Sequence, residues 1–109
     1  MDINSNAEEE INALLAELWE RHLPSTRERL AALERAIANG GAQSLKETER
    51  AEARSIAHKL SGNLGMFGHQ QAGLIAGEIE EVLKSPSEES LPQLVSLVQR
   101  LRQVLEPYL

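Results

Sequence analysis

The 109-residue sequence has no cysteine, only three aromatic residues and no long apolar run. Without cysteine it can form neither a disulfide nor a thiolate metal site. No apolar run approaches the length that crosses a membrane, and the acidic, polar start MDINSNAEEE is not a signal peptide. A formal net charge of −6 argues against general binding to nucleic acid. We therefore expect a soluble, cytoplasmic protein with an aliphatic core.

The composition favours helices, because alanine, leucine, glutamate, glutamine and arginine are abundant and β-branched residues are scarce. The length suits one domain, so residues 1–109 are predicted to fold as a single unit. Apolar residues recur at helical spacing and the connections are short, which predicts an all-α, antiparallel up-down-up-down four-helix bundle over residues 24–109. Residues 1–23 are predicted to form an additional helical segment, either a cap on the bundle or an extension of its first helix.

Serine followed by glutamate three residues later marks four predicted helix starts with capping-box spacing. Pro24 is expected to interrupt or kink the first helical stretch. Helix ends are predicted at the sequence NGG of residues 39–41 and at Gly68. The four capping pairs are Ser5 and Glu8, Ser25 and Glu28, Ser44 and Glu47, and Ser85 and Glu88.

A histidine stands on the side of the third helical segment that faces away from its apolar stripe. At about 100° per residue, His58 lies roughly 150° from the stripe. Its neighbours on this face are small, apart from Arg54. A glycine inside a helix costs about 1 kcal/mol relative to alanine, so two glycines here need a reason. The stripe comprises Ala53, Ile56, Ala57, Leu60, Leu64 and Phe67, and the small neighbours are Ala51, Ser55, Ser61, Gly62 and Gly65.

The small residues predict a face on which the backbone of another protein approaches an exposed imidazole. A neutral imidazole is a nucleophile at cellular pH, and phosphoryl transfer requires mainly positioning and charge stabilisation. The alternative is that Gly62 and Gly65 allow close packing between helices. Gly73 and Gly77, four residues apart in the next helix, suit that packing role better.

The stretch AHKLSGNLGMFGHQQAGLIAGEIE, residues 57–80, resembles the signature of the histidine-containing phosphotransfer (HPt) domain family. In that pattern a phospho-accepting histidine follows an alanine, and a leucine and a glycine lie two and four residues after the histidine. A further glycine lies about ten residues after it, and a leucine or isoleucine followed by glutamate closes the motif. The matching residues are His58, Leu60, Gly62, Gly68, Ile79 and Glu80.

The resemblance implies that His58 accepts a phosphoryl group from the aspartate of a receiver domain and passes it to another receiver. The implied partners are a response-regulator receiver domain, a hybrid histidine kinase, or both. The implied domain is monomeric, catalyses nothing alone and needs no cofactor, because Mg²⁺ is held by the receiver. The face around His58 is then the docking surface, with Ala51, Ser55, Gly62, Gly65 and His69 as its predicted residues.

One residue departs from the family pattern. A lysine usually lies three residues after the histidine, where it helps to stabilise the phosphoryl group, and this position is Ser61. We expect Arg54 or Lys59 to supply the missing positive charge, with Ser61 donating a hydrogen bond. Because of this departure, a second function stays possible, which is a degenerate HPt-like adaptor that binds a receiver without being phosphorylated.

Other assignments are weaker. His69 is placed where it could orient the phosphoryl group, but a surface role at a helix start fits better. Metal binding by His58 and His69 is not expected, because they are eleven residues apart and lack the i, i+4 spacing of a helical zinc pair.

The phosphoacceptor domain of a histidine kinase fits poorly, since Lys59 replaces the usual acidic residue and the chain has no room for an ATP-binding domain. The initiating methionine and the short tail after the last helix fit a free-standing domain.

Overall fold

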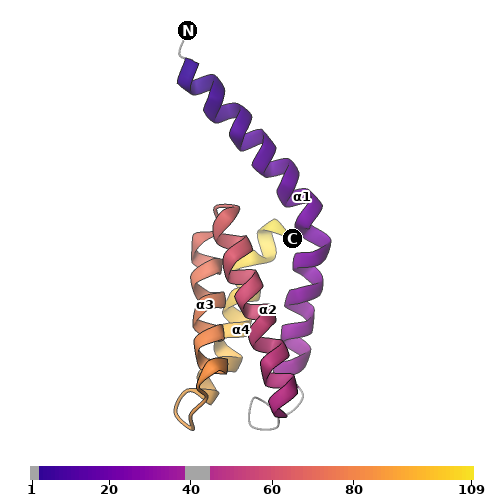
Figure 1. The fold of residues 1–109 in the computed structure, drawn as a ribbon, viewed down its shortest axis with the longest axis vertical. Coiled ribbons are helices and arrows are strands. Elements are labelled where there is room, and N and C mark those ends of the chain that lie inside the picture. Colours follow the sequence, from indigo (N-terminus) through magenta and orange to yellow (C-terminus); the bar gives the residue numbers. More distant parts are fainter. Residues whose placement is uncertain (1–2, 39–44) are drawn as a thin grey trace.

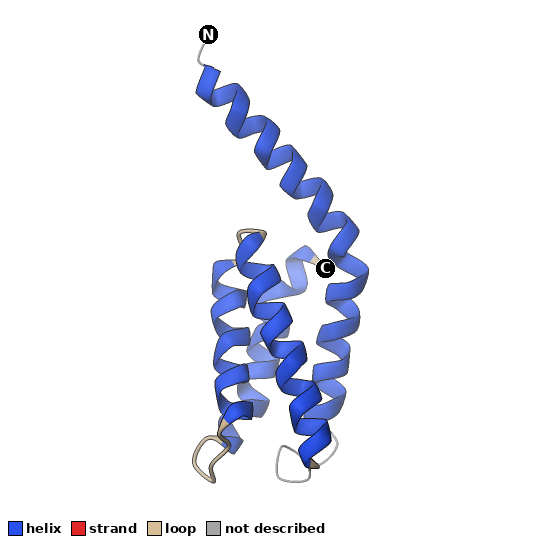
Figure 2. Cartoon of the chain, in the orientation of Figure 1, coloured by secondary structure: helices blue, strands red, loops and turns tan. Residues whose placement is uncertain are grey.

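The computed structural model describes residues 3–38 and 45–109, and these residues form α-helices, one short 3-10 helix and no strand. Figure 1 shows the order of the elements and Figure 2 shows that loops only connect them. The all-helical prediction is confirmed. The elements are α1 (Ile3–Ala38), α2 (Glu47–Met66), α3 (Gln70–Lys84), α4 (Leu91–Leu105) and the 3-10 helix η2 (Glu106–Tyr108).

Helices α2, α3 and α4 form a bundle with the C-terminal half of α1 (Figure 1). Helix α2 packs against α3, α3 against α4, and α1 against both α2 and α4. The core is aliphatic, as the composition indicates. The largest fully buried side chains are Leu30, Leu33, Leu60, Leu64, Ile79, Leu83, Leu94, Leu101 and Leu105.

Helix α1 runs without interruption through Pro24, so the segment before this proline and the first bundle helix are one helix. The helix changes direction along its length, and its N-terminal half projects away from the bundle (Figure 1). Pro24 cannot donate a hydrogen bond to the preceding turn, and the Thr26 hydroxyl donates at 3.0 Å to the His22 carbonyl. Both features bend helices.

The predicted helix starts were less accurate than the predicted helices. Ser25 and Glu28 lie inside α1, so no cap forms there. Ser5 also lies within α1, which begins at Ile3. Capping-box spacing alone was misleading here, because α1 continues across both serines.

The last capping prediction was also wrong. Ser85 ends α3, and α4 begins only after Ser90. Ser87 and Ser90 instead bond to each other in the connection, where the Ser87 amide donates to Ser90 Oγ at 2.9 Å. Helix α2 begins after Lys46. The predicted stop at residues 39–41 and the predicted start at Ser44 lie outside the described residues.

The end of α2 follows the sequence prediction. Gly68 has a φ of 86°, a left-handed conformation that glycine adopts without steric cost. Its amide donates to the Gly65 carbonyl at 3.1 Å, and the His69 amide donates to the Leu64 carbonyl at 2.9 Å. This pair of bonds is a Schellman motif, which satisfies two carbonyls at the helix end.

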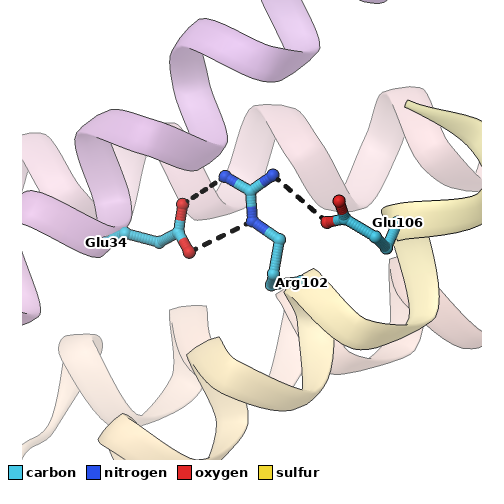
Figure 3. A network of polar contacts seen from close by, with 3 residues as sticks. All are labelled: Glu34, Arg102 and Glu106. Carbon is cyan, nitrogen blue, oxygen red and sulfur yellow. Dashed lines mark hydrogen bonds and ion pairs between the residues drawn. The ribbon is translucent and has the colours of Figure 1, made fainter.

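An arginine on α4 connects two other parts of the bundle (Figure 3). The Arg102 guanidinium donates to both carboxylate oxygens of Glu34 on α1, with Nη2 to Oε1 at 2.5 Å and Nε to Oε2 at 3.2 Å. It also reaches Glu106 in η2. The hydrogen bond that Arg102 donates to Glu34 raises the pKa of Arg102 above its ordinary value. The network joins α1 to the C-terminal end of α4.

Among the residues that the structure describes, no helix is both long enough and apolar enough to cross a membrane.

Candidate functional site

His58 lies in the middle of α2 with its side chain 76% exposed. Ala57 and Leu60 on either side of it point into the core and are fully buried. Because successive residues turn by about 100°, this burial forces the imidazole outward. The sequence prediction of an exposed histidine opposite the apolar stripe is confirmed.

The imidazole is held by a carboxylate from the neighbouring helix. Nδ1 of His58 lies 2.9 Å from Oε2 and 3.0 Å from Oε1 of Glu80 on α3. The Glu80 side chain is only 19% exposed, so its orientation is restricted by packing. A carboxylate accepts hydrogen bonds, so Nδ1 carries the proton and donates it. The lone pair of the neutral ring is therefore on Nε2.

This arrangement determines which nitrogen of His58 can react. Nε2 is the nucleophilic nitrogen, and a nucleophile is most effective when a second group orients it. Glu80 fixes the tautomer and the ring orientation, and its negative charge stabilises the positive ring that forms when Nε2 gains a substituent. The pair can therefore accept an electrophilic group on Nε2.

His58 and Glu80 line a shallow depression between α2 and α3. Two cations, Arg54 on α2 and Lys84 on α3, lie in its lining. Ala51 and Ser55 complete it, so the structure brings together three of the predicted neighbours of His58. A negatively charged group attached to the imidazole would therefore lie in a depression that contains two positive charges.

A separate contact fastens the two helices beside this depression. Nη1 of Arg50 on α2 donates to the Leu83 carbonyl near the end of α3 at 2.6 Å. Carbonyls in the last turn of a helix lack intrahelical partners, and a cation there also interacts favourably with the helix dipole. The bond holds the end of α3, which includes Lys84, against α2.

The glycines of α2 and α3 have different roles. A Cβ added to Gly62 or Gly65 would meet no atom within 4 Å, so both positions are open to an approaching molecule. A Cβ added to Gly73 would lie 3.2 Å from the Gly65 amide nitrogen and 3.3 Å from the Ser61 carbonyl. Gly73 therefore allows the two helices to approach closely, as its position in the sequence predicts. The surface of α2 at Gly62 has neither a side chain nor a neighbouring residue that covers it.

The other predicted support residues lie elsewhere. Ser61 lines a different depression, shared with Gly73 and Gly77 of α3, and its Oγ would lie 3.4 Å from a Cβ on Gly77. Lys59 is exposed on α2 but does not line the depression that contains His58. The predicted roles of these two side chains at the phosphoryl group stay predictions.

His69 does not line the depression around His58. Its ring centroid lies 4.4 Å from that of Trp19 on α1 and 4.7 Å from that of Tyr108 in η2. Phe67 also packs on Trp19, with centroids 5.5 Å apart. Partial burial lowers the pKa of His69 below its ordinary value of 6.5. His69 thus joins three segments at one end of the bundle, and its predicted place on the docking surface stays a prediction.

Sequence reasoning did not assign Glu80 or Lys84 to the site. Glu80 was recognised only as the end of the family motif, and Lys84 was not considered. Both lie on α3, more than twenty residues from His58 along the chain. The i, i+4 spacing of Glu80 and Lys84 places them on the same side of α3, which is the signal that could have identified them together.

No group of histidine, cysteine, aspartate and glutamate side chains that could hold a metal ion occurs in residues 3–38 and 45–109.

A bundle of helices that presents one exposed histidine on an open face is the class of structure that the sequence resemblance implies. The model of the Hpt domain family matches residues 17–106, which is most of the chain, so the protein belongs to the HPt domain family. Protein RcaC of Microchaete diplosiphon is similar, with 30% identity over 78 residues. These residues are 72% of this chain but 12% of that relative. No solved structure matches the chain.

Proposed function

We propose that the protein is a phosphorelay intermediate in cytoplasmic two-component signalling, with His58 as its phosphoryl acceptor. The observation that carries this proposal is the exposed imidazole whose Nδ1 is bonded to Glu80, which leaves Nε2 as the nitrogen with a free lone pair. Membership of the HPt family supports the same role. The proposal includes the antiparallel up-down-up-down arrangement of the bundle helices that the sequence predicts.

The transfer step is a displacement at phosphorus. Nε2 of His58 forms a bond to the phosphoryl group of a receiver's aspartyl phosphate, and the bond between phosphorus and the aspartate oxygen breaks. The aspartate leaves as a carboxylate. The imidazole keeps its proton on Nδ1 and becomes positively charged, which the Glu80 carboxylate offsets. The reverse step passes the phosphoryl group to a second receiver.

Positive charge for the phosphoryl oxygens comes from Arg54 and Lys84 in this proposal. Both line the depression around His58, whereas the family's lysine position is occupied by Ser61. Cations beside a transferring phosphoryl group stabilise its charge without taking part in covalent chemistry. The Mg²⁺ needed for transfer is supplied by the receiver's own acidic site.

The face that contains Gly62 and Gly65 is the proposed docking surface. A receiver must bring its aspartyl phosphate to Nε2, so the backbone around His58 must be accessible. Both glycines have open space at the Cβ position. Ala51 and Ser55 extend the same face with small side chains.

The test is phosphotransfer from a panel of radiolabelled phospho-receiver domains to the wild type and to His58→Gln. His69→Gln is the matched control, since it removes a histidine that lies outside the depression. We expect an acid-labile, base-stable label on the wild type and on His69→Gln, and none on His58→Gln. Label that persists on His58→Gln would contradict the assignment of the acceptor.

The alternative function is a receiver-binding adaptor that is not phosphorylated. The serine at position 61 favours this alternative, since it removes the usual cation. Receiver binding measured by titration calorimetry, without label on any histidine, would establish the adaptor and reject the relay. Chemical phosphorylation by phosphoramidate, which needs no partner protein, then shows whether Nε2 is reactive at all.

A further inference from the structure

Helices α2 and α3 lie side by side in one register (Figure 1). Three facing pairs define it: His58 with Glu80, Ser61 with Gly77, and Gly65 with Gly73. Steps of three and then four residues forward along α2 are matched by the same steps backward along α3. In this register position 50 of α2 is level with position 88, which lies beyond Lys84, the last residue of α3.

Arg50 therefore lies on a part of α2 that extends past the end of α3, and its long side chain reaches back to that end. Its Nη1 donates to the Leu83 carbonyl at 2.6 Å, although the two residues are 33 positions apart. Arg50 is not among the residues that line the depression around His58. Any effect of Arg50 on the imidazole must therefore pass through α3.

The Leu83 carbonyl depends on this donor. In a helix that continued, it would accept from the amide four residues later, which is that of Ser87. The Ser87 amide donates instead to Ser90 Oγ at 2.9 Å. Leu83 is only 1% exposed, so water has little access to replace the missing donor. Because a buried carbonyl without a partner is costly, the arginine bond stabilises the last turn of α3.

The same turn places both groups that act on the imidazole. Glu80 is three residues before Leu83, and Lys84 directly follows it. The Glu80 carbonyl and the Lys84 amide are partners in the helical bonding pattern. Unwinding of the turn would break this bond, carry Lys84 out of the depression and release the backbone from which Glu80 reaches Nδ1.

We propose that Arg50 is a positioning residue of the phosphoryl site. By holding the last turn of α3, its bond to the Leu83 carbonyl keeps the Glu80 carboxylate on Nδ1 of His58 and keeps Lys84 in the depression. The effect of Arg50 on phosphoryl transfer rests on the proposed function, whereas its effect on the imidazole is a property of the protein alone.

The first test is the ¹⁵N spectrum of the His58 imidazole in Arg50→Met, which keeps an unbranched side chain but has no donor. We expect a mixture of tautomers, whereas the wild type shows Nδ1–H. Amide hydrogen exchange at residues 82–84 should be about two- to tenfold faster, the factor that corresponds to one hydrogen bond. Arg50→Lys should restore part of the wild-type spectrum, because an ammonium group still donates.

Arg102→Met is the matched control, because it removes another arginine that joins two helices through its bonds to Glu34. It should lower the stability of the bundle and leave the His58 spectrum unchanged. A wild-type spectrum in Arg50→Met would overturn the proposal, since the arginine would then contribute to stability alone. The same mixture of tautomers in Arg102→Met would overturn it too.

The second test is single-turnover transfer from one phospho-receiver. Arg50→Met should slow transfer about two- to tenfold. In a protein that already carries Glu80→Ala and Lys84→Ala, it should have little further effect, because the groups through which it acts are absent. A full additional loss there would overturn the proposed route through α3. If the wild type accepts no label, the relay fails, and the imidazole spectra then decide the role of Arg50.

Discussion

Glu80 on α3 accepts a hydrogen bond from Nδ1 of His58 on α2, with both carboxylate oxygens within 3.0 Å of this nitrogen. The bond crosses between two helices and occupies Nδ1, so Nε2 keeps the free lone pair. A surface histidine without such a partner exchanges between two tautomers. Here one tautomer is selected before any partner arrives. The carboxylate is thus the group on which reactivity at Nε2 depends in the proposed relay.

Replacing Glu80 with alanine should slow phosphoryl transfer to His58 about tenfold or more, which is about 1.4 kcal/mol of activation free energy. The ring loses both its orientation and the negative charge that offsets the phosphorylated imidazole. Glu80→Gln should give an intermediate rate, because its amide oxygen still accepts the hydrogen bond. Single-turnover transfer from one phospho-receiver measures both rates.

The same variants have a readout that does not involve a partner. ¹⁵N chemical shifts of the imidazole should show the Nδ1–H tautomer in the wild type and a mixture in Glu80→Ala. A variant with unchanged tautomer and unchanged rate would show that the carboxylate plays no part in the chemistry.

Removing the cations of the depression should slow transfer by smaller factors. Arg54→Ala and Lys84→Ala should each reduce the rate about two- to fivefold, since an exposed charge interaction contributes about 0.2 to 1 kcal/mol. Lys59→Ala is the control, because Lys59 is exposed on α2 outside the depression. The measurement is the initial rate at low and high salt, and the effect should shrink as screening increases. Equal rates for all three variants would locate the positive charge on the receiver instead.

Alanine at two glycines should change stability in opposite directions. Gly62→Ala should raise the free energy of unfolding by about 0.5 to 1 kcal/mol, because the Cβ meets open space and glycine disfavours helix. Gly73→Ala should lower it by about 1 to 3 kcal/mol, since its Cβ would press on the backbone at Gly65 and Ser61. Urea unfolding followed by circular dichroism measures both. A stabilising Gly73→Ala would mean that the helices separate easily.

Stability should fall in mild acid because of His69. Burial lowers its pKa in the folded protein below the ordinary value of 6.5, so the folded state favours the neutral ring. Above about pH 6.5 both states are neutral and the contribution is complete. As the pH falls below this value the unfolded chain binds the proton first, and stability is lost down to the folded pKa.

The measurement for this prediction is urea unfolding between pH 5 and pH 8 for the wild type and His69→Phe. The phenylalanine keeps an aromatic ring between Trp19 and Tyr108 but does not titrate. The difference between the two proteins should be pH-independent above about pH 6.5 and change below it. A constant difference over the whole range would assign the acid sensitivity to other groups.

The sequence predicted the helices of the bundle and the exposure of His58, because both depend on periodicity within a single helix. Burial of Ala57 and Leu60 follows from the 3.6-residue repeat, and exposure of His58 follows from the same repeat. The helix end at Gly68 was also predicted correctly, because a helix that ends in a left-handed conformation usually has glycine at that position.

The parts that the sequence did not predict depend on how helices align. The contact of Glu80 with His58 requires the register of α3 against α2, which no local pattern specifies. The packing of the His69 ring against Trp19 was likewise not predicted, because it depends on how the end of α2 lies against α1. Ser25 was taken as a helix start, although the apolar face of α1 continues past it.

The close approach of α2 and α3 at Gly73 affects the imidazole of His58, which lies elsewhere on α2. Gly73 lies about two turns from Glu80 along α3, and its lack of a side chain sets how near α3 lies to α2. A slip of one residue between the helices, about 1.5 Å, would carry the carboxylate away from Nδ1. Which nitrogen of the imidazole is free to react is therefore determined by the spacing of two backbones. The tautomer of His58 therefore reports the alignment of α2 and α3, and it can be measured in the intact protein.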